Sequence, residues 1–337
     1  MHQELRFATF NVCNLALPGT KYYDDQIPYS VEEYDTKISW LAQQLDKLDA
    51  DIIALQEVFS QTAVTDVLAK TEKYRDAHHA GFDPAIDADH LTPSVALISR
   101  LPLKNGAREF TSLPNNLVIP LPGVSDAITH FTRPILHAQV QVDPTLLINV
   151  FVCHLKSKLP DYRNMAETDV LDHYIDQTGM AMLRSLIRRG VDALGLRSLL
   201  TMQSQSEHLP TVVMGDFNDI ANATSTQMVM GLGQYPTNGH DNRLFDCTKI
   251  QSQHALHNEI GYTHMHDGNF EIIDHILVSE EFNSASPHAI GEVIDVRYLN
   301  DHMLFRQPHM SDHGAVLVRI RLCPHQGALR EGGTRRI

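Results

Sequence analysis

A buried strand that ends in polar residues is the feature that most constrains this fold. Val212 to Met214 form an apolar run typical of a strand inside a core. Gly215 then allows the backbone to turn, and Asp216 and Asn218 follow two residues apart. Because side chains two apart on an extended chain point to the same side, a carboxylate and a carboxamide are presented together. The alternative interpretation is an ordinary polar turn after a strand.

Polar residues that can take part in catalysis stand at the ends of several expected strands, including this one. They are Asn11, Glu57, His154, Asp216 with Asn218, Asp274, and Asp312 with His313. Ligand sites of α/β proteins form where strands run out, because side chains from several strands converge at the edge of a sheet. We therefore expect these residues to meet in a single site.

The spacing of apolar residues predicts one layered α/β domain over residues 1–323. Helices are expected at 31–48, 60–72, around 183–194 and near 224–231, and strands at 5–12, 51–57, 94–99, 135–142, 146–153, 212–214, 270–278, 293–298 and 315–322. Many connections are too short for helical crossovers, which favours mixed or mostly antiparallel sheets over a purely parallel fold. Residues 324–337 are rich in glycine and arginine, and we expect a disordered tail.

Composition bounds the setting of the protein. The chain has 337 residues and a formal net charge of −14, which argues against broad, non-specific binding to duplex nucleic acid. No apolar run is long enough for a membrane span, and the N-terminal residues pass straight into a strand without room for a signal peptide. The scattered cysteines are typical of a reducing compartment. We therefore expect a cytoplasmic protein, and no obligate protein partner is evident.

Several basic residues follow the strand that ends at His154 or fall in the helix expected around 183–194. They are Lys156, Lys158, Arg184, Arg188 and Arg189. The helical period places the arginines away from the apolar side of that helix. One interpretation is a positive lip beside an otherwise acidic site, through which a nucleic acid could approach. The other is a solvated helix face.

The motifs around the strand ends resemble those of the endonuclease/exonuclease/phosphatase superfamily, the DNase I-like metal-dependent phosphodiesterases. The matching motifs, in the order of the family, are Phe10–Val12, Leu55–Val58, His154–Lys156, Gly215–Asn218, Ile273–His275 and Ser311–His313. The run from His154 to Lys158 looks closest to bacterial DNase I-like nucleases. The resemblance implies a two-layer mixed β-sandwich flanked by helices, the DNase I-like four-layer fold, with the site at one edge.

The resemblance also implies a role for each site residue. Glu57 would be the main ligand of Mg²⁺ or Mn²⁺, with Asn11 and Asp312 near the metal. Asp216 would orient or deprotonate the attacking water, and Asn218 would bind this water or a phosphate oxygen. The remaining expected residues are His154 and Arg133 as phosphate contacts, and Asp274 with His313 as a carboxylate–imidazole pair. Mg²⁺ prefers oxygen ligands and keeps several waters, so one or two carboxylates suffice.

Simpler interpretations of the same residues stay open. Asn11 could close a turn, and Asp312 could be a turn residue with His313 as its partner. His154 could be a core histidine, and Arg133 a surface residue before a proline. A zinc set could be formed by three other histidines, His264, His266 and His275, which we instead expect to be surface or rim residues.

The expected activity is divalent-metal-dependent hydrolysis of a phosphodiester by in-line attack of water, most simply by a nuclease. The abasic-site endonucleases carry a tyrosine where His154 stands, which argues against that role. Two alternatives remain: a small-molecule or lipid-headgroup phosphoesterase, as in sphingomyelinases and inositol-phosphate phosphatases, and a non-catalytic binding module. The sequence does not decide between DNA, RNA and small phosphoesters, or between endo- and exo-action.

Overall fold

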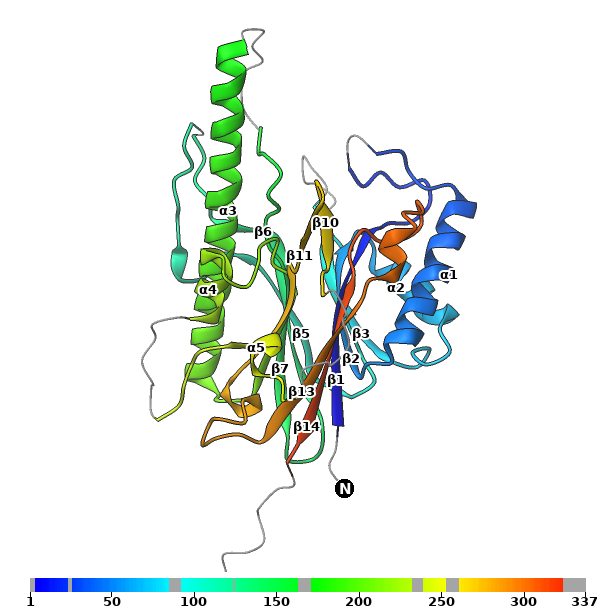
Figure 1. The fold of residues 1–337 in the computed structure, drawn as a ribbon, viewed down its shortest axis with the longest axis vertical. Helices are drawn as coiled ribbons and strands as arrows, with labels where there is room; N and C mark the ends of the chain where they lie inside the picture. The colour runs from blue at the N-terminus through cyan, green and yellow to red at the C-terminus, as the bar shows by residue number, and fades with distance from the viewer. Residues whose placement is uncertain are drawn as a thin grey trace, which may run out of the picture.

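Two β-sheets packed face to face form the centre of the molecule, with helices covering each outer side (Figure 1). The computed structural model describes residues 4–23, 26–84, 92–123, 125–162, 171–231, 239–252 and 261–323. The expected tail at 324–337 lies outside the described residues. The arrangement confirms the expected four-layer α/β sandwich.

Each sheet contains a single parallel pair of strands among otherwise antiparallel neighbours. The first sheet has the order β13 (Gly291–Leu299), β14 (Ala315–Leu322), β1 (Glu4–Leu15), β2 (Ile52–Val58), β4 (Ser94–Ser99) and β3 (His78–Gly81). The second has the order β5 (Leu103–Ser112), β6 (His130–Gln141), β7 (Leu147–His154), β8 (Thr211–Asp216), β12 (Asp274–Val278) and β9 (Phe245–Asp246). The parallel pairs are β1 with β2 and β7 with β8. The sheets are therefore mixed, as expected.

Helices provide the crossovers that the two parallel pairs require. The helix α1 (Val31–Leu48) connects β1 to β2, and α3 (Leu171–Ser206) lies between β7 and β8. The smaller elements are α2 (Gln61–Lys70), α4 (Thr224–Met230), α5 (Cys247–Ile250), β10 (His264–His266), β11 (Asn269–Glu271), η1 (Pro114–Asn116), η2 (Glu280–Phe282) and η3 (Asp301–Leu304). In Figure 1, α1 and α2 cover the first sheet, and α3 and α4 cover the second. Within the described ranges, no helix is long and apolar enough to cross a membrane.

The core is divided into layers that follow from the alternation of side chains along the strands. Phe7, Ile52 and Val212 belong to the buried cluster between the two sheets. The neighbouring residues Ala8 and Ile53 point to the opposite face and pack with the helices α1 and α2. The inner strands are thus buried on both faces, which holds their ends rigidly in place.

The helix α1 has the bounds that its periodicity predicts, because signals at both of its ends agree with the apolar pattern. Glu33 N–H donates to Ser30 Oγ at 3.2 Å, and Ser30 N–H donates to Glu33 Oε2 at 2.8 Å, which forms a capping box. Asp49 ends the helix with a left-handed φ of 49°, and its N–H donates to Leu45 O.

The expected continuous strand over residues 270–278 is wrong, because the chain is interrupted just before Asp274. The strand β11 ends at Glu271, and β12 begins at Asp274. Between them, Thr263 Oγ1 accepts hydrogen bonds from the N–H groups of Ile273 and Asp274, at 3.0 and 3.2 Å. A side chain from another loop thus replaces strand pairing there, which sequence periodicity does not reveal.

Candidate active site

Three neighbouring strands of the second sheet present a row of ionisable side chains at one end. Asp216 lies at the end of β8, directly opposite His154 on β7 and Asp274 on β12 in the pairing register. All three residues are buried. Gly215 permits this close alignment, because a Cβ at its position would lie 1.9 Å from Cys153 O. The register brings together residues that are far apart in the sequence.

Asn11 and Glu57 reach this row from the first sheet. Asn11 Nδ2 donates to Asp216 Oδ2 at 3.1 Å and to Glu57 Oε1 at 3.2 Å, which links the two sheets. Asn11 Oδ1 accepts a hydrogen bond from Cys13 N–H at 3.0 Å, and this bond fixes the amide with its Nδ2 toward the carboxylates. Asn11 therefore orients Glu57 and Asp216 through N–H donors.

Bulges in β1 and β2 turn Glu57 toward the site. The pairing of these strands shifts register between Asn11 and Leu15, and Asn14 in this bulge has a φ of 59°. Glu57 itself has a φ of 62°, and its Oε2 accepts a hydrogen bond from Asn14 N–H at 3.0 Å. Non-glycine residues with positive φ carry a conformational cost of about 1–3 kcal/mol and concentrate at functional sites.

The segment Ser311–His313 closes the site from the start of β14. Ser311 Oγ donates to Asn11 O at 2.6 Å and accepts from His313 N–H at 3.0 Å. His313 Nδ1 lies 2.8 Å from Asp274 Oδ2, and its Nε2 lies 3.9 Å from Asp216 Oδ2. Burial acts to lower the pKa of His313, but the two nearby carboxylates raise it well above the ordinary value. The imidazole is therefore held as a cation against Asp274.

In His154 and Asp216, burial is the dominant influence, and both pKa values shift toward the neutral form. Burial, with the nearby Arg133 and His313, lowers the pKa of His154 well below its ordinary value, so this imidazole is neutral. Its Nε2 lies 3.3 Å from Asp216 Oδ2. Burial and the charge of Asp274 raise the pKa of Asp216 to about 7. A divalent cation close by would favour the ionised form of this carboxylate.

Hydrogen-bond donors surround the place where an anionic oxygen could bind. Arg133 Nη1 and Asn218 Nδ2 both donate to Leu155 O, at 2.8 and 3.0 Å. Asn218 N–H donates to Asp216 Oδ1 at 2.8 Å. Within the described part of the chain, the buried atoms Arg133 Nε and His154 Nδ1 have no hydrogen-bond partner. The unpaired N–H of Arg133 is suited to a phosphate oxygen, whereas His154 Nδ1 donates only in the tautomer that carries the proton there.

Carboxylate oxygens offer the ligands that a hard divalent cation requires. Each oxygen of Glu57 accepts one N–H, so lone pairs stay available on both. Asp312 is exposed at the same opening, where the desolvation of its carboxyl is outweighed by His313 and Cys13, so that its pKa lies below the ordinary value. Asp216 and Asp274 cluster with His313, and Asp312 clusters with His264 and His313; in these groups the carboxylates offer lone pairs to a cation, and the protonated His313 does not. The donor set fits Mg²⁺ or Mn²⁺.

A sequence profile of the Endonuclease/Exonuclease/phosphatase family matches residues 8–313, a range that contains every residue of this site. The chain belongs to this family. Its members are hydrolytic, divalent-metal-dependent phosphoesterases, and the acidic cluster described above is a candidate metal site of that kind. A comparison with curated proteins gave no match.

Solved structures with the same fold come from bacteria and from human. A family protein from Leptotrichia buccalis has a TM-score of 0.56 at 17% identity, covering 94% of this chain and 99% of that chain. The human nocturnin catalytic domain, solved with a bound sulfate anion, has a TM-score of 0.55 at 15% identity, covering 96% and 98%. A mannosyl-6-phosphatase from Bacteroides thetaiotaomicron has a TM-score of 0.53 at 17% identity, covering 94% and 99%. At such identities the likeness establishes the fold alone.

Lys37 is a site residue that the motifs of the family did not identify. Its side chain is buried near Glu57 and Asp312, whose charges favour its protonated form. Burial outweighs these charges and lowers the pKa of Lys37. The available signal was a lysine on the apolar face of α1, four residues before the buried Leu41.

The arginines of α3 do not form a solvated helix face. Arg184 and Arg189 are buried. Arg184 Nε donates to Pro122 O at 2.9 Å, which ties the loop after η1 to the helix, and Arg189 Nε lies 3.1 Å from Asp219 Oδ2. Lys158 Nζ lies 3.0 Å from Glu271 Oε2. Carboxylates thus pair with Lys158 and Arg189, whereas Arg184 donates to backbone carbonyls and keeps its charge.

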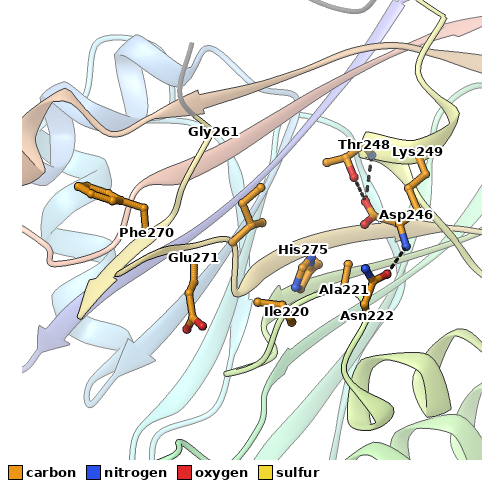
Figure 2. A pocket seen from close by; sticks show the side chains of 11 residues that line it. Ile220, Ala221, Asn222, Asp246, Thr248, Lys249, Gly261, Phe270, Glu271 and His275 are labelled. Atoms are coloured by element: carbon orange, nitrogen blue, oxygen red, sulfur yellow. Dashed lines mark hydrogen bonds between the residues drawn. The ribbon is translucent and has the colours of Figure 1, made fainter. Parts of the chain in front are cut away.

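The expectation that His275 lies on the surface or rim is wrong, because its ring is buried on the outer face of the second sheet. His275 follows Asp274, so its side chain points away from the row formed by His154, Asp216 and Asp274. It packs edge-on against Phe217, and its Nε2 lies 2.9 Å from Asp219 O. His275 lines an open pocket of ≈ 440 Å³ together with Glu271 and Phe270 (Figure 2). This pocket contains none of the expected catalytic residues.

Proposed function

We propose that the protein is a Mg²⁺- or Mn²⁺-dependent phosphodiester hydrolase that uses in-line attack of water, and that its substrate is a nucleic acid. The observation that carries the proposal is the link made by Asn11, which joins Glu57 on one sheet to Asp216 on the other. A cation ligand and a proton acceptor are thereby held on either side of one opening. When bound, a divalent cation would supply stabilisation of charge on the phosphorane oxygens.

The side chains around the opening would act in distinct ways. Glu57 and Asp312 would hold the cation, with Asn11 keeping Glu57 in place. Asp216 would orient the attacking water and accept its proton, since its pKa of about 7 suits a general base and the cationic His313 favours its ionised form. The imidazolium of His313 would stabilise the negative charge that develops on the phosphoryl oxygens.

Donors on the second sheet would bind the phosphate in its ground state. Arg133 and Asn218 converge on the carbonyl of Leu155, His154 lies against Asp216, and the buried Arg133 Nε has no partner among the described residues. Removal of such a donor from a preorganised site typically slows catalysis about 10²–10³-fold.

A small-molecule or lipid-headgroup phosphodiester is the second candidate substrate. The observation that favours it is the pairing of Lys158 with Glu271 and of Arg189 with Asp219, which leaves these basic groups neutralised on an acidic protein. A nuclease without a positive approach to its site gains little electrostatic steering.

Hydrolysis of a substrate panel, with Mg²⁺ or Mn²⁺, tests the proposal. The panel contains single- and double-stranded DNA, RNA, sphingomyelin, inositol phosphates and bis-p-nitrophenyl phosphate. The substitution Glu57→Gln should weaken Mg²⁺ binding in calorimetry and reduce turnover on every accepted phosphoester by about 10²-fold or more. The matched control Glu32→Gln, on the exposed first turn of α1, should change neither property. Unchanged Mg²⁺ affinity in Glu57→Gln would remove Glu57 from the metal site, and activity restricted to small diesters would replace nucleic acid as substrate.

A further inference from the structure

A second group of metal-ligating side chains lies at the end of the sandwich opposite to the active site. It consists of His208 before β8, His240 before β9, and Glu280 and Glu281 in η2 after β12. The strand β8 runs from Thr211 to Asp216, so about 17 Å of extended chain separates this end of the sheet from the active-site residue Asp216. In Figure 1 the orange segment that contains η2 lies beside the lower end of α3, away from β10 and β11.

The four side chains converge on one point. His208 Nε2 lies 2.9 Å from Glu281 Oε1, and His240 Nδ1 lies 3.0 Å from Glu280 Oε1. The two imidazole rings are 3.9 Å apart between their centroids. One nitrogen or oxygen atom from each of the four residues lies within 4.8 Å of the others. Zinc–ligand bonds in tetrahedral protein sites are about 2.0–2.2 Å long, so the four atoms would draw closer together around the ion.

The two glutamates are buried side by side, which is costly for carboxylates without a compensating cation. Within the part of the chain that the structure describes, their ion-pair partners are these histidines. Both histidines are about one-third exposed, with side-chain accessibilities of 34% and 32%, so an ion can enter from solvent. A divalent cation would supply the positive charge that this pair of carboxylates requires.

Neighbouring groups orient both carboxylates toward the histidines. Ser286 Oγ donates to Glu280 Oε2 at 2.7 Å, and Asp241 N–H donates to Glu280 Oε1 at 3.0 Å. The hydroxyl of Ser279 donates to Glu281 Oε2. Thr211 N–H in turn donates to Ser279 Oγ at 2.8 Å, which connects this support to the start of β8. Hydrogen bonds that fix the ligands in this way are typical of metal sites.

We propose that His208, His240, Glu280 and Glu281 bind one Zn²⁺ ion, separately from the catalytic cation. Two imidazole nitrogens and two carboxylate oxygens form a set that suits a borderline transition metal, whereas the active site is rich in oxygen ligands and suits Mg²⁺. The ion would lie between each histidine and its glutamate, in place of their direct contacts. With four protein ligands the site is closed, so its role is structural: it joins the segment after α3, the segment before β9 and η2.

Zn²⁺ binding to the metal-stripped full chain, with Mg²⁺ in excess to occupy the active site, tests this proposal. Equilibrium dialysis followed by elemental analysis should show that the double variant His208→Gln/His240→Gln binds one Zn²⁺ per chain fewer than the wild type. The affinity of the site for Zn²⁺ should fall at least about 100-fold. The substitution Glu281→Gln, of nearly equal volume, serves as a second variant that changes the ligand set with less effect on folding.

The matched control is His288→Gln. The ring of His288 lies 4.3 Å from that of His240, but its Nε2 lies 3.1 Å from Gly239 O and it is not one of the four ligands. This variant should keep the wild-type stoichiometry, and all variants should keep Mg²⁺-dependent phosphoester hydrolysis. Co²⁺ in place of Zn²⁺ should give the intense visible absorption of tetrahedral coordination in the wild type and in His288→Gln alone. Equal Zn²⁺ stoichiometry in the wild type and both ligand variants, or a weak octahedral Co²⁺ spectrum, would overturn the proposal.

Discussion

At the scale of single residues, the sequence predicts which side chains meet but not how they are oriented. The positions of Asn11, Asp216 and His313 follow from polar residues at strand ends together with the family motifs. From the sequence, the amide oxygen of Asn11 could have faced a cation. In the structure this oxygen instead accepts the hydrogen bond from Cys13 N–H, so that Nδ2 faces the carboxylates. Glu57 depends in the same way on a left-handed backbone that no residue type in its strand announces.

The pair Asp274 and His313 allows a direct test of joint action. The 2.8 Å contact keeps the imidazole protonated and oriented, so the loss of either partner should remove the same contribution. We expect kcat/KM on one diester to fall about 10²–10³-fold in Asp274→Asn and in His313→Ala, with the double variant little worse than either. Circular dichroism of each variant provides the control for folding. Losses that multiply in the double variant would show that the two residues act independently.

Arg189 gives a second prediction at this scale, on stability. Its buried guanidinium lies 3.1 Å from Asp219 Oδ2 and donates to Lys156 O at 3.3 Å, next to the active-site strand ends. Arg189→Met should lower the free energy of unfolding by about 2 kcal/mol, because it removes a charged hydrogen bond from Asp219, a partly buried carboxylate that keeps Ser225 and the more distant Lys158 as partners. Denaturant unfolding measures this loss. The exposed Arg75→Met should stay within about 0.5 kcal/mol of the wild type, and an equally small loss in Arg189→Met would mean that solvent screens the pair.

At the scale of elements, periodicity predicts those that are buried on a regular face and fails where another segment intervenes. The bounds of α1, β4 and β14 match the expectations, because caps and apolar spacing agree there. The strand β5 was not expected, since most of its residues are at least partly exposed and Asn105 and Gly106 interrupt it with positive φ. The break before β12 depends on Thr263, which is remote in sequence.

The buried His137, at the pairing of β6 with β7, predicts a dependence of stability on pH. His137 on β6 is buried, stacks on Phe151 and lies 3.0 Å from Asn149 Oδ1 on β7. Burial lowers its pKa in the folded protein, whereas the unfolded chain takes up a proton as the pH falls below about 6.5. The unfolded state then binds more protons, so this residue is neutral for stability at higher pH and destabilising in acid.

His137→Gln should therefore lose less stability than the wild type when the pH is lowered from about 8 to about 5, each unit of pKa shift being worth about 1.4 kcal/mol. Denaturant unfolding at both pH values measures the difference, with the exposed His78→Gln as control. The same loss of stability in His137→Gln and in the wild type would show that His137 is protonated in the folded protein.

At the scale of the whole molecule, the four layers hold two sets of strand ends against each other, and the active site lies where they meet. The resemblance of the motifs predicts this architecture, and a mixed sheet follows from the short connections. The electrostatics of the surface did not follow from the sequence. Basic residues that a helical period places on one side, such as Arg184 and Arg189, are buried against loops and carboxylates that are remote in sequence.

This charge distribution makes a prediction about how substrates reach the site. The net charge of −14 repels a polyanion, and screening shortens the range of that repulsion from about 30 Å at 0.01 M salt to about 10 Å at 0.1 M. At fixed Mg²⁺, kcat/KM on long DNA should therefore rise by up to roughly 10-fold over this range, whereas hydrolysis of bis-p-nitrophenyl phosphate should change little. Nucleases that attract DNA with free basic groups show the reverse dependence.

The substitution Glu271→Gln tests whether the ion pair of Glu271 with Lys158 contributes to this salt dependence. It removes the 3.0 Å ion pair of Lys158 beside the active site and leaves Lys158 with Asp219 at 3.8 Å, so the rise with salt should become smaller on long DNA and stay unchanged on the small diester. Glu207→Gln removes the same charge from an exposed position after α3, at the other end of β8, and should leave the rise closer to that of the wild type. A wild-type rate on DNA that falls steadily with salt would instead require a free positive surface at the opening. In that case the ion pairs of Lys158 with Glu271 and of Arg189 with Asp219 would have to break when the substrate binds.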